Sequence, residues 1–158
     1  KKFNEKEENA KKFPSFSPEH RRHYYSAYLM FKDNVFFGQG PKMFRKLCHN
    51  EKFFVPRGCT NHPHNNILQL LAETGLVGLF FYCLVMLWIG KFMFQMLLKI
   101  FSGQTISINE YSCIFYMLAL LIAYFPFVPS GNIFNNWLNF SFYICFALAI
   151  YKQKKIYA

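Results

Sequence analysis

The sequence from residue 62 to residue 80 reads HPHNNILQLLAETGLVGLF, and this stretch decides the fold because a polar start leads directly into an apolar run. Pro63 suits the first position of a helix, and His62 suits the capping region before it. The pattern therefore predicts a helix that begins near His62, with His64 in its first turn.

One face of this predicted helix carries a polar stripe. Asn65, Gln69 and Glu73 recur at every fourth position, and residues with this spacing lie on the same helix face. We expect the stripe to face a cleft at the membrane interface. Glu73 lies nearly three turns beyond His64, so we expect a structural role for it rather than a direct pairing with the imidazole.

The composition excludes an ordinary soluble domain. Hydrophobic residues make up 53% of the 158 residues and charged residues only 16%, whereas a typical soluble domain has about 25% charged residues. The same values exclude a disordered tail, a collagen-like chain and a disulfide-rich mini-protein. Because the mean hydropathy is only +0.09, a polar part and a membrane part must share the chain.

Three apolar runs approach the length of about 20 residues that a membrane-spanning helix needs. They lie at about 70–98, 111–128 and 133–151. The sequence therefore predicts a mainly α fold, an integral membrane helical bundle with three C-terminal transmembrane helices. A helical and loop segment, residues 1–69, precedes them, and residues 152–158 form a tail.

The lysines set the expected orientation. Lys99 precedes the loop after the first run, and residues 152–155 hold three lysines after the third, so the positive-inside rule places both on the cytoplasmic side. Residues 1–69 are then extracytoplasmic, and in a bacterium periplasmic, because long translocated segments escape the rule. Since the chain begins with Lys1 and has no signal peptide, we expect a fragment of a longer multi-pass protein of the inner membrane.

All arginines and histidines of the chain precede the first apolar run. The excess of positive charge there attracts anions such as phosphate, nucleic acid or lipid headgroups. The arginines could clamp a phosphate bidentately or only contact lipid headgroups, and their spacing leaves both interpretations open. They are Arg21, Arg22, Arg45 and Arg57.

His64 is the candidate general base. In the first turn of a helix the dipole disfavours the imidazolium form, and a neutral imidazole accepts a proton. The alternative is a structural imidazole that caps a loop or stacks on aromatic rings, and spacing alone favours this alternative. His62 is the competing base, although its place before Pro63 suits a cap better.

Cys48 and Cys59 lie 11 residues apart in the extracytoplasmic segment, where a disulfide is stable. We expect them to pair. Two free thiols are one alternative. A zinc site made by both cysteines with His49 and His62 is another, but the spacing matches no standard zinc pattern, so we expect no metal.

Three motifs together resemble the C-terminal part of the O-antigen ligase/polymerase family of bacterial inner-membrane glycosyltransferases. They are Gly38-Gln-Gly40-Pro-Lys-Met-Phe44, His64-Asn65-Asn-Ile-Leu68 and Glu73-Thr-Gly75-Leu-Val-Gly78. The Pro-rich turn at 125–131 is similar to the closing segment of the family, and the resemblance covers about residues 20–150.

The resemblance implies transfer of a glycan from an undecaprenyl-diphosphate-linked donor to an acceptor hydroxyl, in the synthesis of lipopolysaccharide or another cell-surface polysaccharide. The acceptor would be a glycolipid such as lipid A-core, or a glycan. His64 matches the proposed base of such enzymes, and Arg21 or Arg22 matches a diphosphate-binding arginine. The expected partners also include membrane lipid but no nucleic acid, and the activated donor requires no cofactor.

Other functions fit the same residues. A polysaccharide polymerase or a protein O-oligosaccharyltransferase would share the chemistry and differ in the acceptor. A non-catalytic membrane-anchored module that binds anions belongs to another class. As a fragment, the chain is not expected to be active alone.

Overall fold

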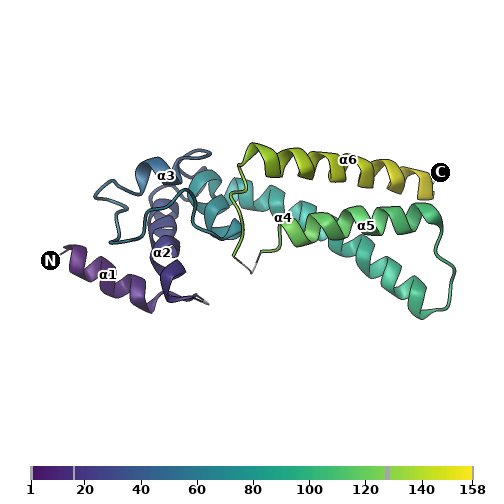
Figure 1. Cartoon of the computed structure of the whole chain (residues 1–158), viewed down its shortest axis with the longest axis horizontal. Coiled ribbons are helices and arrows are strands. Elements are labelled where there is room, and N and C mark those ends of the chain that lie inside the picture. Colours follow the sequence, from purple (N-terminus) through teal and green to yellow (C-terminus); the bar gives the residue numbers. More distant parts are fainter. Residues whose placement is uncertain (1, 16, 127–128, 158) are drawn as a thin grey trace. The chain divides into compact units, whose positions relative to one another are not determined.

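The computed structural model describes residues 2–15, 17–126 and 129–157. Within these residues the chain is mainly helical and has no strand (Figure 1). Two compact units are present: residues 1–81 with 126–135, and residues 82–125 with 136–158. The helices are α1 (Lys2–Lys12), α2 (Pro18–Asp33), α3 (Phe44–Leu47), α4 (Asn66–Phe101), α5 (Ile108–Ala123) and α6 (Asn136–Tyr157).

The first unit is built around α2, with α1 packed along it. Pro18 occupies the start of α2, where its missing N–H leaves no helical hydrogen bond unmade. Ala27 and Met30 of α2 are fully buried and pack in one core with Phe44 of α3 and Ala72 of α4. This core holds α2 against the beginning of α4.

Gly75 interrupts α4. Its φ of 63° and ψ of −159° are not helical, so α4 consists of two helical parts. The N–H groups of Leu76 and Val77 beyond the break cannot reach helical carbonyls, and they donate to the carbonyls of Val35 and Phe36 at 2.9 Å and 3.2 Å. The sequence pattern predicts one continuous helix here, and the break is a correction to it.

The second unit contains the later part of α4 together with α5 and α6, and α5 and α6 run side by side in Figure 1. Ser107 and Glu110 form a capping box that starts α5, and Lys99 donates to the Glu110 carboxylate at 2.7 Å. The buried side chains of the three helices form one core, made of Ile89, Phe92, Met96, Cys113, Met117, Leu120 and Ala149.

Within the described ranges, α4 is the helix whose length and composition suffice to cross a membrane. The second apolar run was expected to be helical from residue 111 to about 128, but α5 ends at Ala123, and residues 127–128 lie outside the described part. Pro126 disfavours a helical conformation at Phe125, which explains the early end. α5 has 16 residues, fewer than the about 20 that an upright span needs.

The third apolar run also differs from its expected bounds. α6 begins at Asn136 rather than at residue 133, because the N–H of Asn135 closes a turn onto the carbonyl of Asn132. The helix continues through the lysines at 152–155 and ends at Tyr157. The expected tail is therefore helical up to that residue.

Candidate functional site

A tight turn before α3 is bonded to α4 just ahead of the break. The backbone N–H groups of Gln39 and Gly40 donate to the carbonyls of Ala72 and Glu73 at 2.9 Å and 2.8 Å. The Gly-Gln-Gly motif and the Glu-Thr-Gly motif of the sequence therefore lie against each other, although more than 30 residues separate them in the chain.

Glycine is required on both sides of this contact. Gly38 has a φ of +65° and Gly75 a φ of +63°, a region that side chains with a Cβ atom rarely adopt. A Cβ atom at Gly38 would lie 2.5 Å from the carbonyl carbon of Glu73, and one at Gly75 would overlap the carbonyl of Phe36. The two motifs thus encode a close backbone approach.

Glu73 is a buried carboxylate that ties α3 to α4. Its side chain accepts a hydrogen bond from the Phe44 N–H at 2.8 Å and another from the Gln69 amide at 3.1 Å. Gln69 in turn donates to Asn132 at 2.7 Å and accepts from the N–H of Ile133 at 3.1 Å. Gln69 and Glu73 are therefore buried and hydrogen-bonded rather than facing a cleft, which corrects the expectation for this part of the stripe. Asn65 is half-buried at its start.

His64 lies before α4 rather than in its first turn, so the predicted helix start near His62 is wrong. α4 begins at Asn66, and the side chain of Asn65 caps it by accepting from the N–H of Leu68 at 3.0 Å. The φ of His64 is +60°, in the left-handed region, and a right-handed helix cannot include such a residue.

Three other histidine rings surround His64. The distance between ring centroids is 4.1 Å to His62, 5.4 Å to His20 and 5.9 Å to His23. His20 and His23 lie about one turn apart on α2, so this helix contributes half of the cluster. We call these four residues the histidine cluster.

Backbone carbonyls fix two of these imidazoles. Nδ1 of His23 lies 3.0 Å from the carbonyl of Gly58, and Nε2 of His62 lies 3.1 Å from the carbonyl of Ser130. Because a carbonyl only accepts, each of these nitrogens carries a proton. His62 therefore pairs with the turn at 126–135 and does not cap α4, contrary to its sequence interpretation.

Burial, and after it charge repulsion by the neighbouring His62, His23 and His20, together lower the pKa of His64 to about 4. His64 is therefore neutral at pH 7. Its ring nitrogens form no hydrogen bond with the described residues, which leaves the imidazole lone pair for a ligand. Since His64 lies outside the helix, burial and neighbouring rings explain the low pKa, and a first-turn position does not.

A cavity of about 420 Å³ lies next to the cluster. Ser15, Tyr24 and Asn65 provide its polar lining, and the Tyr24 hydroxyl donates to the His64 carbonyl at 3.5 Å. Ile67 and Leu68 contribute apolar lining. A ligand with both polar and apolar faces fits this lining.

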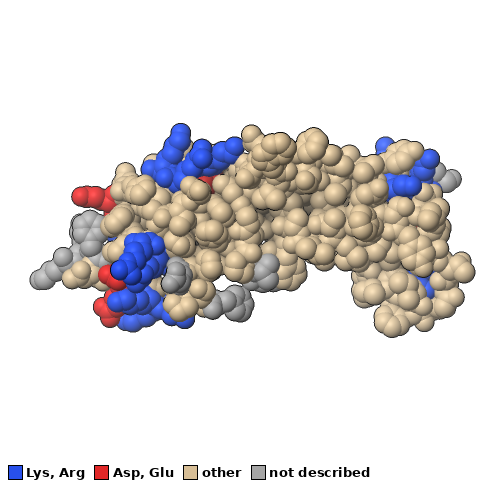
Figure 2. All heavy atoms as spheres, in the orientation of Figure 1, with Lys and Arg blue, Asp and Glu red and all other residues tan. Residues whose placement is uncertain are grey.

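Arg21 and Arg22 point toward α1. Arg21 donates to the carbonyl of Lys11 at 3.0 Å, and Arg22 lies 3.5 Å from the carboxylate of Glu7. Together with Lys11 and Pro18 they line a cavity of about 240 Å³. Nε of Arg21 is buried without a partner among the described residues, and Figure 2 shows basic side chains gathered in this part of the molecule.

Arg45 and Arg57 are exposed. Within the described residues neither side chain forms a hydrogen bond or an ion pair, and neither of the two joins the histidine cluster. The structure thus brings histidines, rather than arginines, against His64.

Cys48 and Cys59 form a disulfide, with their Cα atoms 5.3 Å apart. His49 lies beside them, and the ligand atoms of the three residues lie within 4.8 Å of one another. The fourth member of the zinc site considered above, His62, bonds to Ser130 instead. The disulfide links the end of α3 to the loop before the histidine cluster.

Sequence reasoning missed half of the histidine cluster and the turn that closes it. The His20-x-x-His23 spacing on one helix face is a signal that could have indicated the contribution of α2. Ser130 and Asn132 gave no comparable signal, because they are distant in sequence and their role depends on the tertiary fold.

Comparison with models of known protein families assigns the chain to a family. The family model described as O-antigen ligase matches residues 3–83, just over half of the 158 residues. The chain belongs to the O-antigen ligase family. The searches of curated proteins and of solved structures gave no match.

The part that matches the O-antigen ligase family contains all four members of the histidine cluster, both glycine turns and the disulfide. The turn at 126–135 lies outside the match, yet it supplies the carbonyl that orients His62 and the amide that binds Gln69. In this O-antigen ligase family member the site is therefore completed by residues beyond the matched segment.

Proposed function

We propose that this chain carries the catalytic segment of a membrane glycosyltransferase in polysaccharide biosynthesis. The enzyme transfers a glycan from an undecaprenyl-diphosphate-linked donor to an acceptor hydroxyl, on lipid A-core or on another glycan. His64 removes the proton of that hydroxyl. The observation that carries this proposal is the neutral His64 ring, inside the family match and without a hydrogen-bond partner among the described residues.

The reaction needs two kinds of group. A base must take the hydroxyl proton, and cations must stabilise the charge that develops on the departing diphosphate. His64 fits the first role. Arg21, Arg22 and Lys11 fit the second, because these cations line one cavity, although Glu7 already pairs with Arg22 and Lys11. Arg45 and Arg57 are further candidates from the same segment.

A bound diphosphate would also change the base. A pKa of about 4 makes His64 neutral but weakly basic. An anion near the cluster favours the imidazolium form and raises the pKa toward neutral pH, where proton transfer is most efficient. The donor would thus prepare the base that its own transfer requires.

The membrane placement belongs to the same proposal. α4 from about residue 70, α5 and α6 lie in the bacterial inner membrane as part of a multi-pass protein, and residues 1–69 face the periplasm. Only 22% of the most apolar window of α4 is buried, so much of its apolar surface is available to lipid or to other helices. Lys99 in the last turn of α4 and the lysines near the end of α6 support the orientation.

The proposal is tested in the full-length protein with purified lipid-linked donor and acceptor. Loss of a general base typically costs about 10²–10⁴-fold in rate, so His64→Ala should abolish measurable transfer. His62→Ala should be milder, and His49→Ala, an exposed histidine outside the cluster, is the matched control. Size-exclusion chromatography establishes that each variant is folded.

A His64→Ala protein with near-normal turnover would contradict the base role. In that case the non-catalytic anion-binding module becomes the better interpretation. If transfer is lost as expected, the choice of acceptor distinguishes a ligase from a polymerase or a protein O-oligosaccharyltransferase.

A further inference from the structure

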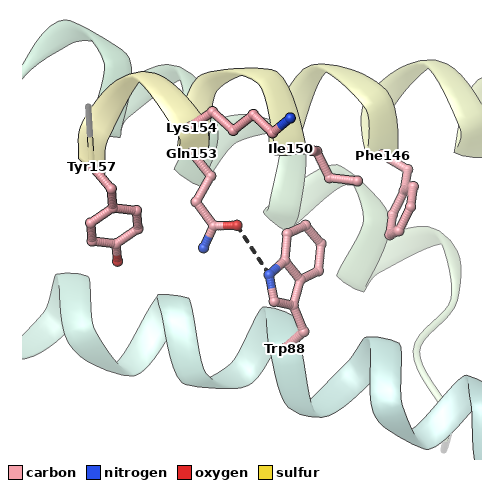
Figure 3. Close-up of a pocket in the computed structure, with 6 residues that line it drawn as sticks. All are labelled: Trp88, Phe146, Ile150, Gln153, Lys154 and Tyr157. Atoms are coloured by element: carbon pink, nitrogen blue, oxygen red, sulfur yellow. Dashed lines mark hydrogen bonds between the residues drawn. The ribbon is translucent and has the colours of Figure 1, made fainter.

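The second unit contains a groove between α4 and α6 (Figure 3). It has a volume of about 780 Å³ and is lined by Trp88 of α4 and by Phe146, Ile150, Gln153, Lys154 and Tyr157 of α6. A second cavity of about 360 Å³ shares Trp88, Gln153 and Tyr157 and adds Lys91 and Gln95 of α4. The two cavities are therefore neighbours along α4 and α6, and we call them together the groove; it plays no part in the proposed transfer.

One half of the groove is apolar. Trp88 packs edge-on against Phe146, with ring centroids 5.5 Å apart, and Ile150 lines the same half. These side chains offer a surface suited to an acyl chain, because nothing in this half requires a hydrogen bond.

The other half is polar. The indole N–H of Trp88 donates to Gln153 at 3.1 Å, and the Tyr157 hydroxyl donates to Gln95 at 3.4 Å. Figure 3 shows Gln153 and Tyr157 directed from α6 toward α4. Lys91 lines this half from α4. Lys154 lines the larger cavity from α6, and in Figure 3 its side chain runs along that helix toward Ile150.

The lysines of the second unit give the surroundings of the groove a positive charge that is not neutralised. The second unit has five lysines and one acidic residue, Glu110, and Lys99 already pairs with that carboxylate. Lys91 and Lys154 have no carboxylate partner among the described residues. Figure 2 shows blue spheres and no red ones at the right-hand end of this face.

We infer that this groove binds one anionic phospholipid of the surrounding bilayer. The inference rests on the membrane placement proposed above. An acyl chain lies against Trp88 and Phe146, and the phosphate binds between Lys91 of α4 and Lys154 of α6, whose long side chains let the two ammonium groups turn to a headgroup. A packed apolar protein helix fits less well, because it would bury the charges of Lys91 and Lys154 without a carboxylate partner.

The test uses the emission of Trp88 in the full-length protein. The protein is reconstituted in vesicles of phosphatidylcholine and phosphatidylglycerol, with bromine, a contact quencher of tryptophan, on the acyl chains of one lipid at a time. Subtracting the signal of the Trp88→Phe variant isolates the emission of Trp88. Brominated phosphatidylglycerol should quench Trp88 more strongly than brominated phosphatidylcholine at equal mole fraction.

Substitution of lysines tests whether the groove itself causes the preference for phosphatidylglycerol. Lys154→Gln should lower the preference about fivefold, the effect of one basic residue near an anionic lipid surface. Lys155→Gln is the matched control, because this neighbouring Nζ lies 5.0 Å over the ring of Tyr151 and does not line the groove. Equal effects of the two variants would overturn the inference.

Equal quenching by both brominated lipids would also overturn the inference. Weak quenching by both would overturn it as well, because it indicates that protein fills the groove. A second measurement avoids the tryptophan variant: mass spectrometry of phospholipid retained after detergent extraction. Wild-type and Lys155→Gln protein should retain phosphatidylglycerol, and Lys154→Gln protein should lose it. Retention by all three would contradict the site.

Discussion

The backbones of Gly38 and Glu73 lie in such close contact that a Cβ atom at position 38 would stand 2.5 Å from the Glu73 carbonyl carbon. This contact joins the turn before α3 to the last residues of α4 before its break. Because α4 begins two residues after His64, the packing of these two backbones helps to determine where His64 lies.

Gly38→Ala should destabilise the protein by about 2–4 kcal/mol, since it adds an overlap with backbone to the cost of a positive φ. Thermal unfolding in detergent measures the change. Gly90→Ala is the control, because no atom lies within 4 Å of a Cβ there and alanine favours a helix by about 0.5–1 kcal/mol. Equal melting temperatures for the two variants would show that the close approach is not required.

Sequence patterns predicted the helical class and the importance of the two glycine motifs, because helix periodicity and turn chemistry are local. They did not predict the break at Gly75, since the carbonyls that satisfy the broken helix come from Val35 and Phe36 in a distant turn. For the same reason the position of His64 was wrong: Pro63 favours a helix start, but the cap that forms uses Asn65.

Removal of the disulfide is a second test of the first unit. Cys48→Ser should lower the free energy of unfolding by about 2–4 kcal/mol, because the bond limits the freedom of the unfolded chain and Cys48 is fully buried. Thermal unfolding with and without a reductant measures this. Cys83→Ser, at an exposed free cysteine, is the control and should behave like the wild type. A wild-type protein that is insensitive to reductant would contradict the stabilising role.

The proposed topology predicts opposite accessibility for two exposed positions. In a background without the three free cysteines, Lys12→Cys should react with a membrane-impermeant maleimide from the periplasmic side. Gln104→Cys, in the loop between α4 and α5, should react only after the inner membrane is opened, because Lys99 favours a cytoplasmic location for this loop. The reverse pattern would exclude the periplasmic placement of residues 1–69.

The histidine cluster predicts a characteristic pH dependence of glycan transfer. The base must be neutral, and the pKa of His64 in the free protein is about 4. The pH profile of kcat/KM reports groups of the free enzyme, so it should stay flat as pH falls from 7 to about 5 and decline only as pH approaches 4. The profile of kcat reports the donor-bound state, in which the anionic diphosphate raises the pKa of His64. The decline of kcat should therefore begin at a higher pH than that of kcat/KM.

One variant separates this explanation from a general effect of acid. Repulsion by a charged His62 contributes to the low pKa of His64, so His62→Gln should raise that pKa and move the decline of kcat/KM to higher pH. His49→Gln, outside the cluster, should leave both profiles unchanged. Initial rates of the purified full-length enzyme between pH 4 and 8 provide the measurement. If kcat and kcat/KM decline at the same pH, and His62→Gln moves neither, His64 does not supply the titrating base, and the link between the donor anion and the histidine cluster is wrong.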